Sequence, residues 1–166
     1  FRRLRRLLRL HGVQFLVICE PKLDVSKIES IRLRIAFDFV MVNRSADLWV
    51  FYMSPFACSL IGSSDQHITL DVSHLLLSTS LVLSWVHAGS SIEERKDLWA
   101  VQLRDKPQVR PWCIGGDFNV ILAPSEKRGG RPFAPTARLD FMSFMEVAKV
   151  FDAGFSGPSF TWCNNR

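Results

Sequence analysis

An acid and an amide stand two residues apart near the middle of the chain, after a short apolar run that starts at Pro111 and ends in Gly115 and Gly116. Residues i and i+2 of a strand point the same way, so we expect Asp117 and Asn119 to project together at the carboxyl end of a buried strand. Open α/β sheets bind ligands at that edge. A carboxylate that orients water beside an amide that donates to an oxyanion suits hydrolysis. A strand that simply ends in an Asp/Asn turn is the structural alternative, and it has about equal weight.

Two further polar side chains are expected at strand ends. Glu20 follows the apolar run 13–18 and comes directly before Pro21, which ends strand pairing. His87 lies near the end of a strand predicted over residues 81–88. Taken alone, Glu20 is more often a solvated edge carboxylate than a ligand, and we favour an ordinary strand-end histidine over a catalytic imidazole for His87.

A basic loop rich in glycine and proline follows the acid–amide pair, over residues 123–133, and it carries Lys127, Arg128 and Arg131. Loops at the carboxyl ends of strands are where substrate contacts are built. Cationic side chains beside a hydrolytic pair would suit a phosphate backbone. A solvated surface loop remains an alternative of equal weight.

The length of 166 residues and the amino-acid composition indicate one globular domain, and its net charge is +5. Five arginines stand within the first ten residues, which favours an anionic partner such as nucleic acid or a membrane surface, although a solvated helix face is the preferred interpretation of this segment alone. A mitochondrial-type presequence is a third possibility. No apolar run is long enough to span a membrane. The four cysteines are widely spaced and contain no C-x-x-C pair, so we expect no zinc site.

The pattern of the chain predicts a mixed α/β sandwich, in which sheets are flanked by helices. Leucine spacing indicates an amphipathic helix over residues 2–11, a capping box at Ser90 or Ser91 predicts a second helix, and residues 138–150 form the third. We interpret residues 22–35 as a loop that could hold a short helix. Strands are predicted over residues 13–18, 37–42, 48–53, 67–72, 81–88, 111–122 and 159–163.

Several segments occur in an order that resembles the endonuclease/exonuclease/phosphatase superfamily. They are Ile18-Cys-Glu-Pro-Lys22, Trp85-Val-His-Ala88, Gly115-Gly-Asp-Phe-Asn119, Glu126-Lys-Arg-Gly-Gly-Arg-Pro132, and Phe160-Thr-Trp-Cys-Asn-Asn-Arg166. More narrowly, they look like the endonuclease domain of plant non-LTR (LINE-type) retrotransposon polyproteins. The resemblance covers nearly the whole chain as a single domain, residues 1–166.

The resemblance implies a four-layered α/β sandwich of two mixed β-sheets with helices outside. Glu20 matches the glutamate that binds the divalent metal, Mg²⁺ or Mn²⁺, and Asp117 matches the aspartate that orients or deprotonates the attacking water. Asn119 matches the amide that stabilises the pentacovalent phosphate, and His87 stands where relatives have a tyrosine. Trp162 and Asn164 would line the nucleic-acid groove, together with Lys127, Arg128 and Arg131.

The resemblance also implies a function, a DNA-nicking endonuclease of a retroelement, with a reverse transcriptase downstream and a nuclear location. We expect a monomer without a membrane partner. Relatives carry a first strand and a final S-D-H segment that this chain lacks, so we expect truncation at both ends and impaired catalysis. Relatives also have glycines where this chain has Ala46 and Asp47, at a turn that requires a glycine-like backbone. A catalytically dead relic that keeps weak nucleic-acid binding and a phosphomonoesterase of the same superfamily are the alternatives.

Overall fold

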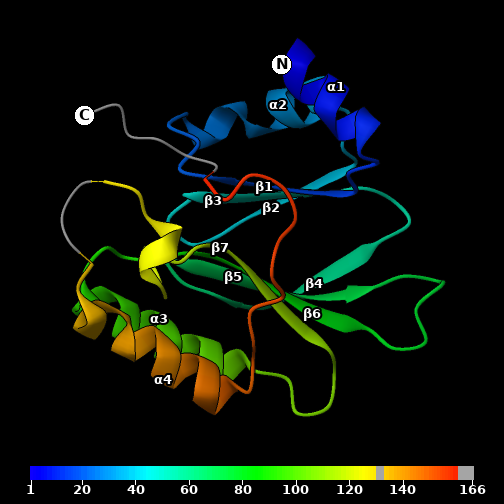
Figure 1. Cartoon of the computed structure of the whole chain (residues 1–166). Helices are drawn as coiled ribbons and strands as arrows, with labels where there is room; N and C mark the ends of the chain where they lie inside the picture. Colours follow the sequence, from blue (N-terminus) through cyan, green and yellow to red (C-terminus); the bar gives the residue numbers. More distant parts are fainter. Residues whose placement is uncertain (130–132, 161–166) are drawn as a thin grey trace.

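Two β-sheets lie face to face and two helices cover the outer face of each, so the molecule has four layers (Figure 1). The structure is a computed structural model, and it describes residues 1–129 and 133–160. The predicted α/β sandwich of two sheets flanked by helices is therefore confirmed.

The first sheet contains three antiparallel strands in the order β1-β3-β2, namely β1 (Phe15–Cys19), β3 (Leu48–Tyr52) and β2 (Phe39–Val42). The strands predicted over 37–42 and 48–53 form a hairpin around residues 43–47, because β2 pairs with β3. Every residue of β3 is buried, since this strand is central in its sheet and has helices on one side and the second sheet on the other. The resemblance implied two mixed sheets, and this one is antiparallel over its described strands.

The second sheet contains four strands in the order β4-β5-β6-β7, namely β4 (Ala57–Ser63), β5 (His67–Ser73), β6 (Leu81–His87) and β7 (Trp112–Asp117). β5 pairs antiparallel with both β4 and β6, and β7 pairs parallel with β6, so this sheet is mixed. The sequence did not predict β4, whose pairing is interrupted by an irregularity between Leu60 and Gly62. The strand predicted over 67–72 is present as β5, which is buried on both faces over most of its length, because it lies between the first sheet and the helices.

Four α-helices form the outer layers: α1 (Arg2–Leu10) and α2 (Ile28–Ile35) on the first sheet, and α3 (Ile92–Asp105) and α4 (Leu139–Ala148) on the second. Ser91, rather than Ser90, caps α3, because its hydroxyl accepts the N–H of Glu94 while the Glu94 carboxylate accepts the N–H of Ser91. Helix α2 occupies the segment that we expected to be mainly loop. Short 3₁₀ turns lie at η1 (Val25–Lys27), η2 (Pro124–Glu126) and η3 (Pro135–Arg138).

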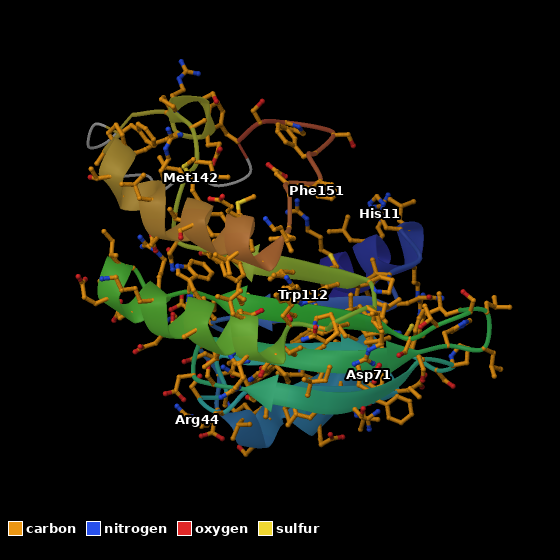
Figure 2. All side chains as sticks on the ribbon, turned by 90° about the horizontal axis from the view of Figure 1, so that it is seen from below. His11, Arg44, Asp71, Trp112, Met142 and Phe151 are labelled. Atoms are coloured by element: carbon orange, nitrogen blue, oxygen red, sulfur yellow. The ribbon has the colours of Figure 1, made fainter. Side chains whose placement is uncertain are left out.

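Three apolar clusters fill the spaces between the four layers. One lies between the first sheet and its helices and includes Trp49, one lies between the sheets and includes Val50, and one lies between the second sheet and its helices and includes Trp99. Because consecutive strand residues face opposite sides, Trp49 and Val50 belong to different clusters. Leu139 and Met142 of α4 are exposed, whereas Phe141, Phe144 and Ala148 are buried; Figure 2 labels Met142 on this helix.

The segment after α4, residues 149–160, has no helix or strand, and Figure 1 shows it running from the helical layer back toward the first sheet. A strand was predicted over 159–163; residues 159 and 160 are not in a strand, and the rest lies outside the described residues. In the part of the chain that the structure describes, no helix is long and apolar enough to cross a membrane.

Candidate active site

The carboxyl ends of β6 and β7 meet because the two strands are parallel neighbours. Their register places His87 directly opposite Asp117 and Trp85 opposite Gly115. Trp85 packs in the cluster between the two sheets, so by strand alternation His87 and Asp117 also project to the side of the first sheet. The structure thus brings two of the predicted site residues together, one from each strand end.

The end of β1 reaches the same place from the other sheet. Burial raises the pKa of the Cys19 thiol, and the negative charge of Asp117 raises it further, while a hydrogen bond from the Asp117 backbone acts in the opposite direction. The carboxylate of Glu20 also raises this pKa, and the charge of His87 in turn acts on Glu20. The charge of His87 thus acts on Glu20, and the charge of Asp117 acts on the neighbouring Cys19.

Glu20 has an unusual backbone conformation and a close cationic neighbour. Its φ is 48°, in the left-handed region that non-glycine residues rarely adopt, and its N–H donates to the carbonyl of Asp47 at 2.8 Å. The carboxylate is exposed, and the ammonium of Lys22 donates to its Oε1 at 2.9 Å. The hydrogen bond and charge of Lys22 lower the pKa of Glu20. The carboxylate is therefore ionised and accessible, with one oxygen engaged.

Asp117 and Asn119 form the turn that we named as the structural alternative. The Oδ1 atom of Asp117 accepts the N–H of Asn119 at 2.9 Å, and Asn119 is left-handed with φ 48°. The amide nitrogen of Asn119 donates to the carbonyl of Ala88 at 2.6 Å. Within residues 1–129 and 133–160 the other carboxylate oxygen of Asp117 accepts no hydrogen bond. The turn therefore fixes both residues and leaves one oxygen of an exposed carboxylate available for chemistry.

The two glycines before Asp117 have different reasons to be glycine. A Cβ on Gly116 would lie 2.0 Å from the carbonyl oxygen of Val86 on β6, and the φ of Gly116 is 137°. Only glycine satisfies both conditions, so Gly116 allows β7 to approach β6. A Cβ on Gly115 would meet no atom within 4 Å. Gly115 therefore borders open space on the same side of the strand as Asp117.

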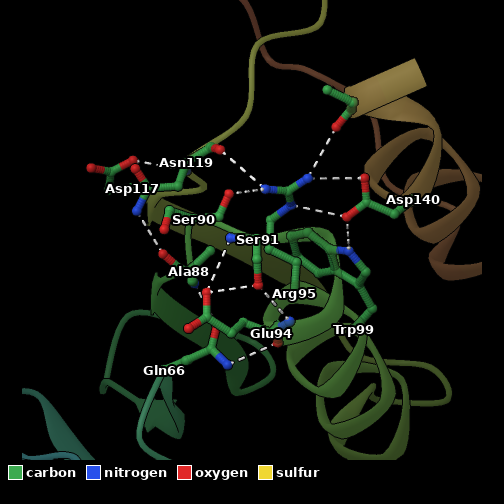
Figure 3. Close-up of polar contacts among 12 residues, drawn as sticks. Gln66, Ala88, Ser90, Ser91, Glu94, Arg95, Trp99, Asp117, Asn119 and Asp140 are labelled. Carbon is green, nitrogen blue, oxygen red and sulfur yellow. Dashed lines mark hydrogen bonds and ion pairs between the residues drawn. The ribbon is translucent and has the colours of Figure 1, made fainter. Parts of the chain in front are cut away.

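A buried arginine holds the loop after Asp117 against the outer helices (Figure 3). Arg95 on α3 is 3% exposed, and its Nη1 donates to the carbonyls of Ser90 at 3.1 Å and Asn119 at 3.4 Å. Its Nε and Nη2 bind the Asp140 carboxylate, at 2.9 Å and 3.3 Å. The Trp99 indole donates to the same carboxylate at 3.0 Å. The position of Asn119 is thereby tied to both helices behind the second sheet.

Gln66, in the turn between β4 and β5, braces the loop after His87 (Figure 3). The backbone of Gln66 accepts the N–H of His87 at 2.8 Å, and its side-chain oxygen accepts the N–H of Gly89 at 2.6 Å. Its side-chain nitrogen donates to the carbonyl of Glu94 at 2.9 Å. These hydrogen bonds fix the path of the backbone where it leaves β6, and they thereby fix the position of His87.

Sequence reasoning missed both Arg95 and Gln66. Arg95 stands in a charged run that is typical of a solvated helix surface, yet it precedes the buried Leu98 and Trp99 by three and four residues. That spacing places it on the same face of α3, which is a signal that could have identified it. For Gln66 no comparable signal exists, because its partners are distant in sequence.

The donor set fits a hard divalent cation that retains most of its water. Glu20 and Asp117 offer exposed carboxylate oxygens, and Mg²⁺ commonly uses one or two carboxylates and keeps several waters. In residues 1–129 and 133–160 no group of three or more His, Cys, Asp or Glu side chains is arranged to hold a metal.

The predicted nucleic-acid contacts are only partly described. Lys127 and Arg128 are exposed and follow η2, where the Glu126 carboxylate accepts the N–H groups of Leu122 and Ala123 at 3.0 Å and 3.1 Å. The turn thus presents two cations in the loop after the candidate site. Three other predicted contacts, Arg131, Trp162 and Asn164, lie outside the described residues.

Comparison with protein-family models gives no match for this chain, and a search of the curated proteins also gives none. The site geometry and the motif resemblance are therefore the basis for any functional conclusion.

Proposed function

We propose that this chain is a metal-dependent phosphodiester hydrolase domain that nicks DNA, of the kind found in plant non-LTR retroelements. The observation that supports this most is the convergence of Glu20, His87 and Asp117 at strand ends from both sheets. An accessible acid pair, an imidazole and an amide in one place fit phosphoryl chemistry. The motif order of the sequence points to the same reaction.

The reaction consumes one water and one phosphodiester and gives a phosphomonoester and an alcohol. The available oxygen of Asp117 accepts a proton from the attacking water while that water forms a bond to phosphorus. The bond from phosphorus to the leaving oxygen breaks, and that oxygen takes up a proton. The imidazole of His87 can donate a hydrogen bond to the phosphate at this stage.

The side-chain amide of Asn119 would donate a hydrogen bond that stabilises the negative charge developing on the phosphate. One of its two amide hydrogens is held by the carbonyl of Ala88, so the second is the one that remains for the substrate. Arg95 keeps this residue in place through its carbonyl. Mg²⁺ or Mn²⁺ held by Glu20 would supply a positive charge that polarises the phosphate.

Nicking of supercoiled plasmid in the presence of Mg²⁺ tests the proposal. We expect the wild-type chain to convert supercoiled DNA to open circles, and Asp117→Asn to lose at least about 100-fold of that rate, as removal of a general base does. Asp24→Asn is the matched control, because Asp24 also accepts the N–H group two residues later, at 2.8 Å, and is exposed. Equal nicking by wild type and Asp117→Asn would refute the proposed chemistry.

A non-enzymatic role is the second candidate, and the geometry of Asn119 favours it to a degree. Both its backbone N–H and its amide nitrogen are used within the protein, as in an ordinary structural turn. In that case the fold would be retained for nucleic-acid binding alone, as in a decayed retroelement. Duplex binding by the wild type without any Mg²⁺-dependent nicking would support this candidate.

A further inference from the structure

Four arginines of α1 lie on one side of the helix. Arg2, Arg5, Arg6 and Arg9 are spaced at i, i+3, i+4 and i+7, which puts them in one stripe along about 10 Å of helix. All four are exposed, and together they line a hollow of about 340 Å³. We call this surface the arginine stripe.

Among the described residues, no acidic group forms an ion pair with the arginine stripe. Within the described residues, none of the four guanidiniums forms an ion pair, and none donates a hydrogen bond. Helix α1 contains no acidic residue, and Arg34 from α2 adds another cation where it lies 4.3 Å over the ring of Phe1. Guanidinium groups that repel one another are stabilised by an external polyanion.

The opposite side of α1 is used by the protein itself. Leu8 is 8% exposed and belongs to the core beneath the first sheet's helices, and Leu4 packs against the same cluster. An amphipathic helix binds a bilayer by burying its apolar face in the lipid. Because Leu4 and Leu8 are already packed on the first sheet, and only Leu7 and Leu10 remain exposed, at 44% and 70%, α1 offers a bilayer a reduced apolar face beside its full charge.

We propose that the arginine stripe is a contact surface for the phosphate backbone of nucleic acid, separate from the candidate active site. Guanidinium groups bind phosphate oxygens in bidentate geometry, and a row of them along one helix matches the regular charge of a nucleic-acid strand. Binding there is independent of base sequence, since backbone contacts position a protein without reading bases. The surface does not depend on the proposed hydrolysis, because no residue of it belongs to the site.

Fluorescence anisotropy with a mixed-sequence DNA duplex of about 20 base pairs, without divalent metal, tests this. A variant with Arg2, Arg5, Arg6 and Arg9 changed to Gln should bind at least about tenfold more weakly at low salt. Its slope of log affinity against log salt should fall by about 3–4, roughly one for each phosphate that the variant no longer neutralises. The control changes Lys27, Lys96, Lys106 and Lys149 to Gln, which removes the same charge elsewhere. Equal weakening in both variants would overturn the proposal, because net charge alone would then explain binding.

A measurement on the wild-type chain does not depend on the folding of a variant. Hydroxyphenylglyoxal modifies accessible arginines, and peptide mass spectrometry reports each position. The duplex should protect Arg2, Arg5, Arg6 and Arg9 at least about threefold, while Arg44, held by Asp65 at 2.8 Å, serves as the internal reference. Absence of protection by the duplex overturns the proposal. So does protection by vesicles that contain phosphatidylserine but not by DNA, which would identify a membrane surface instead.

Discussion

The guanidinium of Arg95 donates hydrogen bonds to both carboxylate oxygens of Asp140, and so joins α3 to α4 behind the candidate site. Both side chains are almost fully buried, at 3% and 6% exposure. Burial alone would raise the pKa of Asp140, but hydrogen bonds from Arg95 and Trp99 outweigh it, and the pKa is lowered. The pair is thus ionised, and each charge depends on the other.

Loss of one charge in this pair should be costly. Asp140→Asn leaves the guanidinium of Arg95 buried without its counter-ion, so we expect a loss of about 3–5 kcal/mol in the free energy of unfolding. Urea denaturation followed by tryptophan fluorescence measures it. Asp65→Asn is the control, because the Arg44–Asp65 pair has similar geometry but is exposed, and its loss should matter much less. Equal losses would show that burial does not determine how much an ion pair contributes to the free energy of unfolding.

Two alanines are predicted to be worse than glycine at their positions. Ala46, in the β2–β3 turn, has φ 61° and Ala36, after α2, has φ 62°. The left-handed conformation costs an L-residue about 1–2 kcal/mol. The additional conformational entropy that glycine loses on folding costs less than that. Ala46→Gly and Ala36→Gly should each stabilise the chain by about 0.5–1 kcal/mol. Ala100→Gly in the exposed middle of α3 should destabilise it by about 1 kcal/mol. Three losses of similar size would contradict the assigned backbone conformations.

The neighbouring glycines of β7 should respond differently to alanine. Gly116→Ala places a methyl group against the carbonyl of Val86 and forces an unfavourable φ, so we expect a loss on the order of 3 kcal/mol. Gly115→Ala meets no atom and should leave thermal stability close to that of the wild type. Differential scanning fluorimetry compares the two melting temperatures. A larger loss at Gly115 would mean that the packing of β6 on β7 is not the reason for these glycines.

His67 should make the stability depend on pH. It is fully buried between Ser64 at 2.6 Å and Asp105 at 3.0 Å, and burial lowers its pKa although the bond to Asp105 acts in the opposite direction. The unfolded chain therefore binds a proton, below about pH 6.5, that the folded chain resists. The free energy of unfolding should fall as pH decreases from about 7 to 5, by up to about 1.4 kcal/mol per pH unit.

The matched variant for this effect is His67→Gln, which cannot titrate. Urea denaturation of both proteins across the same pH range should give a steeper slope for the wild type, whatever the absolute stability of the variant. Parallel slopes would assign the pH dependence to other groups.

Lys22 should compete with a metal ion for Glu20. Its ammonium bonds to Oε1 of that carboxylate at 2.9 Å, so Lys22→Met frees an oxygen and removes a repulsive charge. We expect the affinity for Mn²⁺, measured by electron paramagnetic resonance, to rise several-fold in Lys22→Met and to fall in Glu20→Gln. Lys27→Met is the control for the loss of a nearby charge. Unchanged affinity in all three variants would place any metal away from Glu20.

Elements with local signals could be predicted from the sequence. The serine and glutamate three residues apart at the start of α3 give a capping box, and the hairpin of β2 and β3 follows from two apolar runs around a short polar turn. β4 had no such signal, because Leu60 and Ile61 are exposed on an edge strand and Gly62 interrupts its pairing. Helix α2 has mixed polarity and is stabilised by the burial of Ile31 and Ile35, which only the assembled layers reveal.

The candidate site was predictable to the extent that it depends on neighbouring strands. Apolar runs placed Asp117 and His87 each near the end of its own strand, and the register of β6 and β7 sets the two residues opposite each other. That Glu20 lies near them depends on how one sheet packs on the other, which no local pattern encodes. The role of Arg95 depends likewise on α3 meeting α4, and its partner Asp140 is 45 residues away.

Parallel pairing of β6 with β7 has a consequence for the order of events during synthesis. His87 and Asp117 are 117 − 87 = 30 residues apart, and α3 must cross over the sheet before they can face each other. At ordinary elongation rates Asp117 is added about 1.5–6 s after His87. A nascent chain therefore presents its arginine-bearing helix first, and acquires its candidate active site only when the crossover has closed.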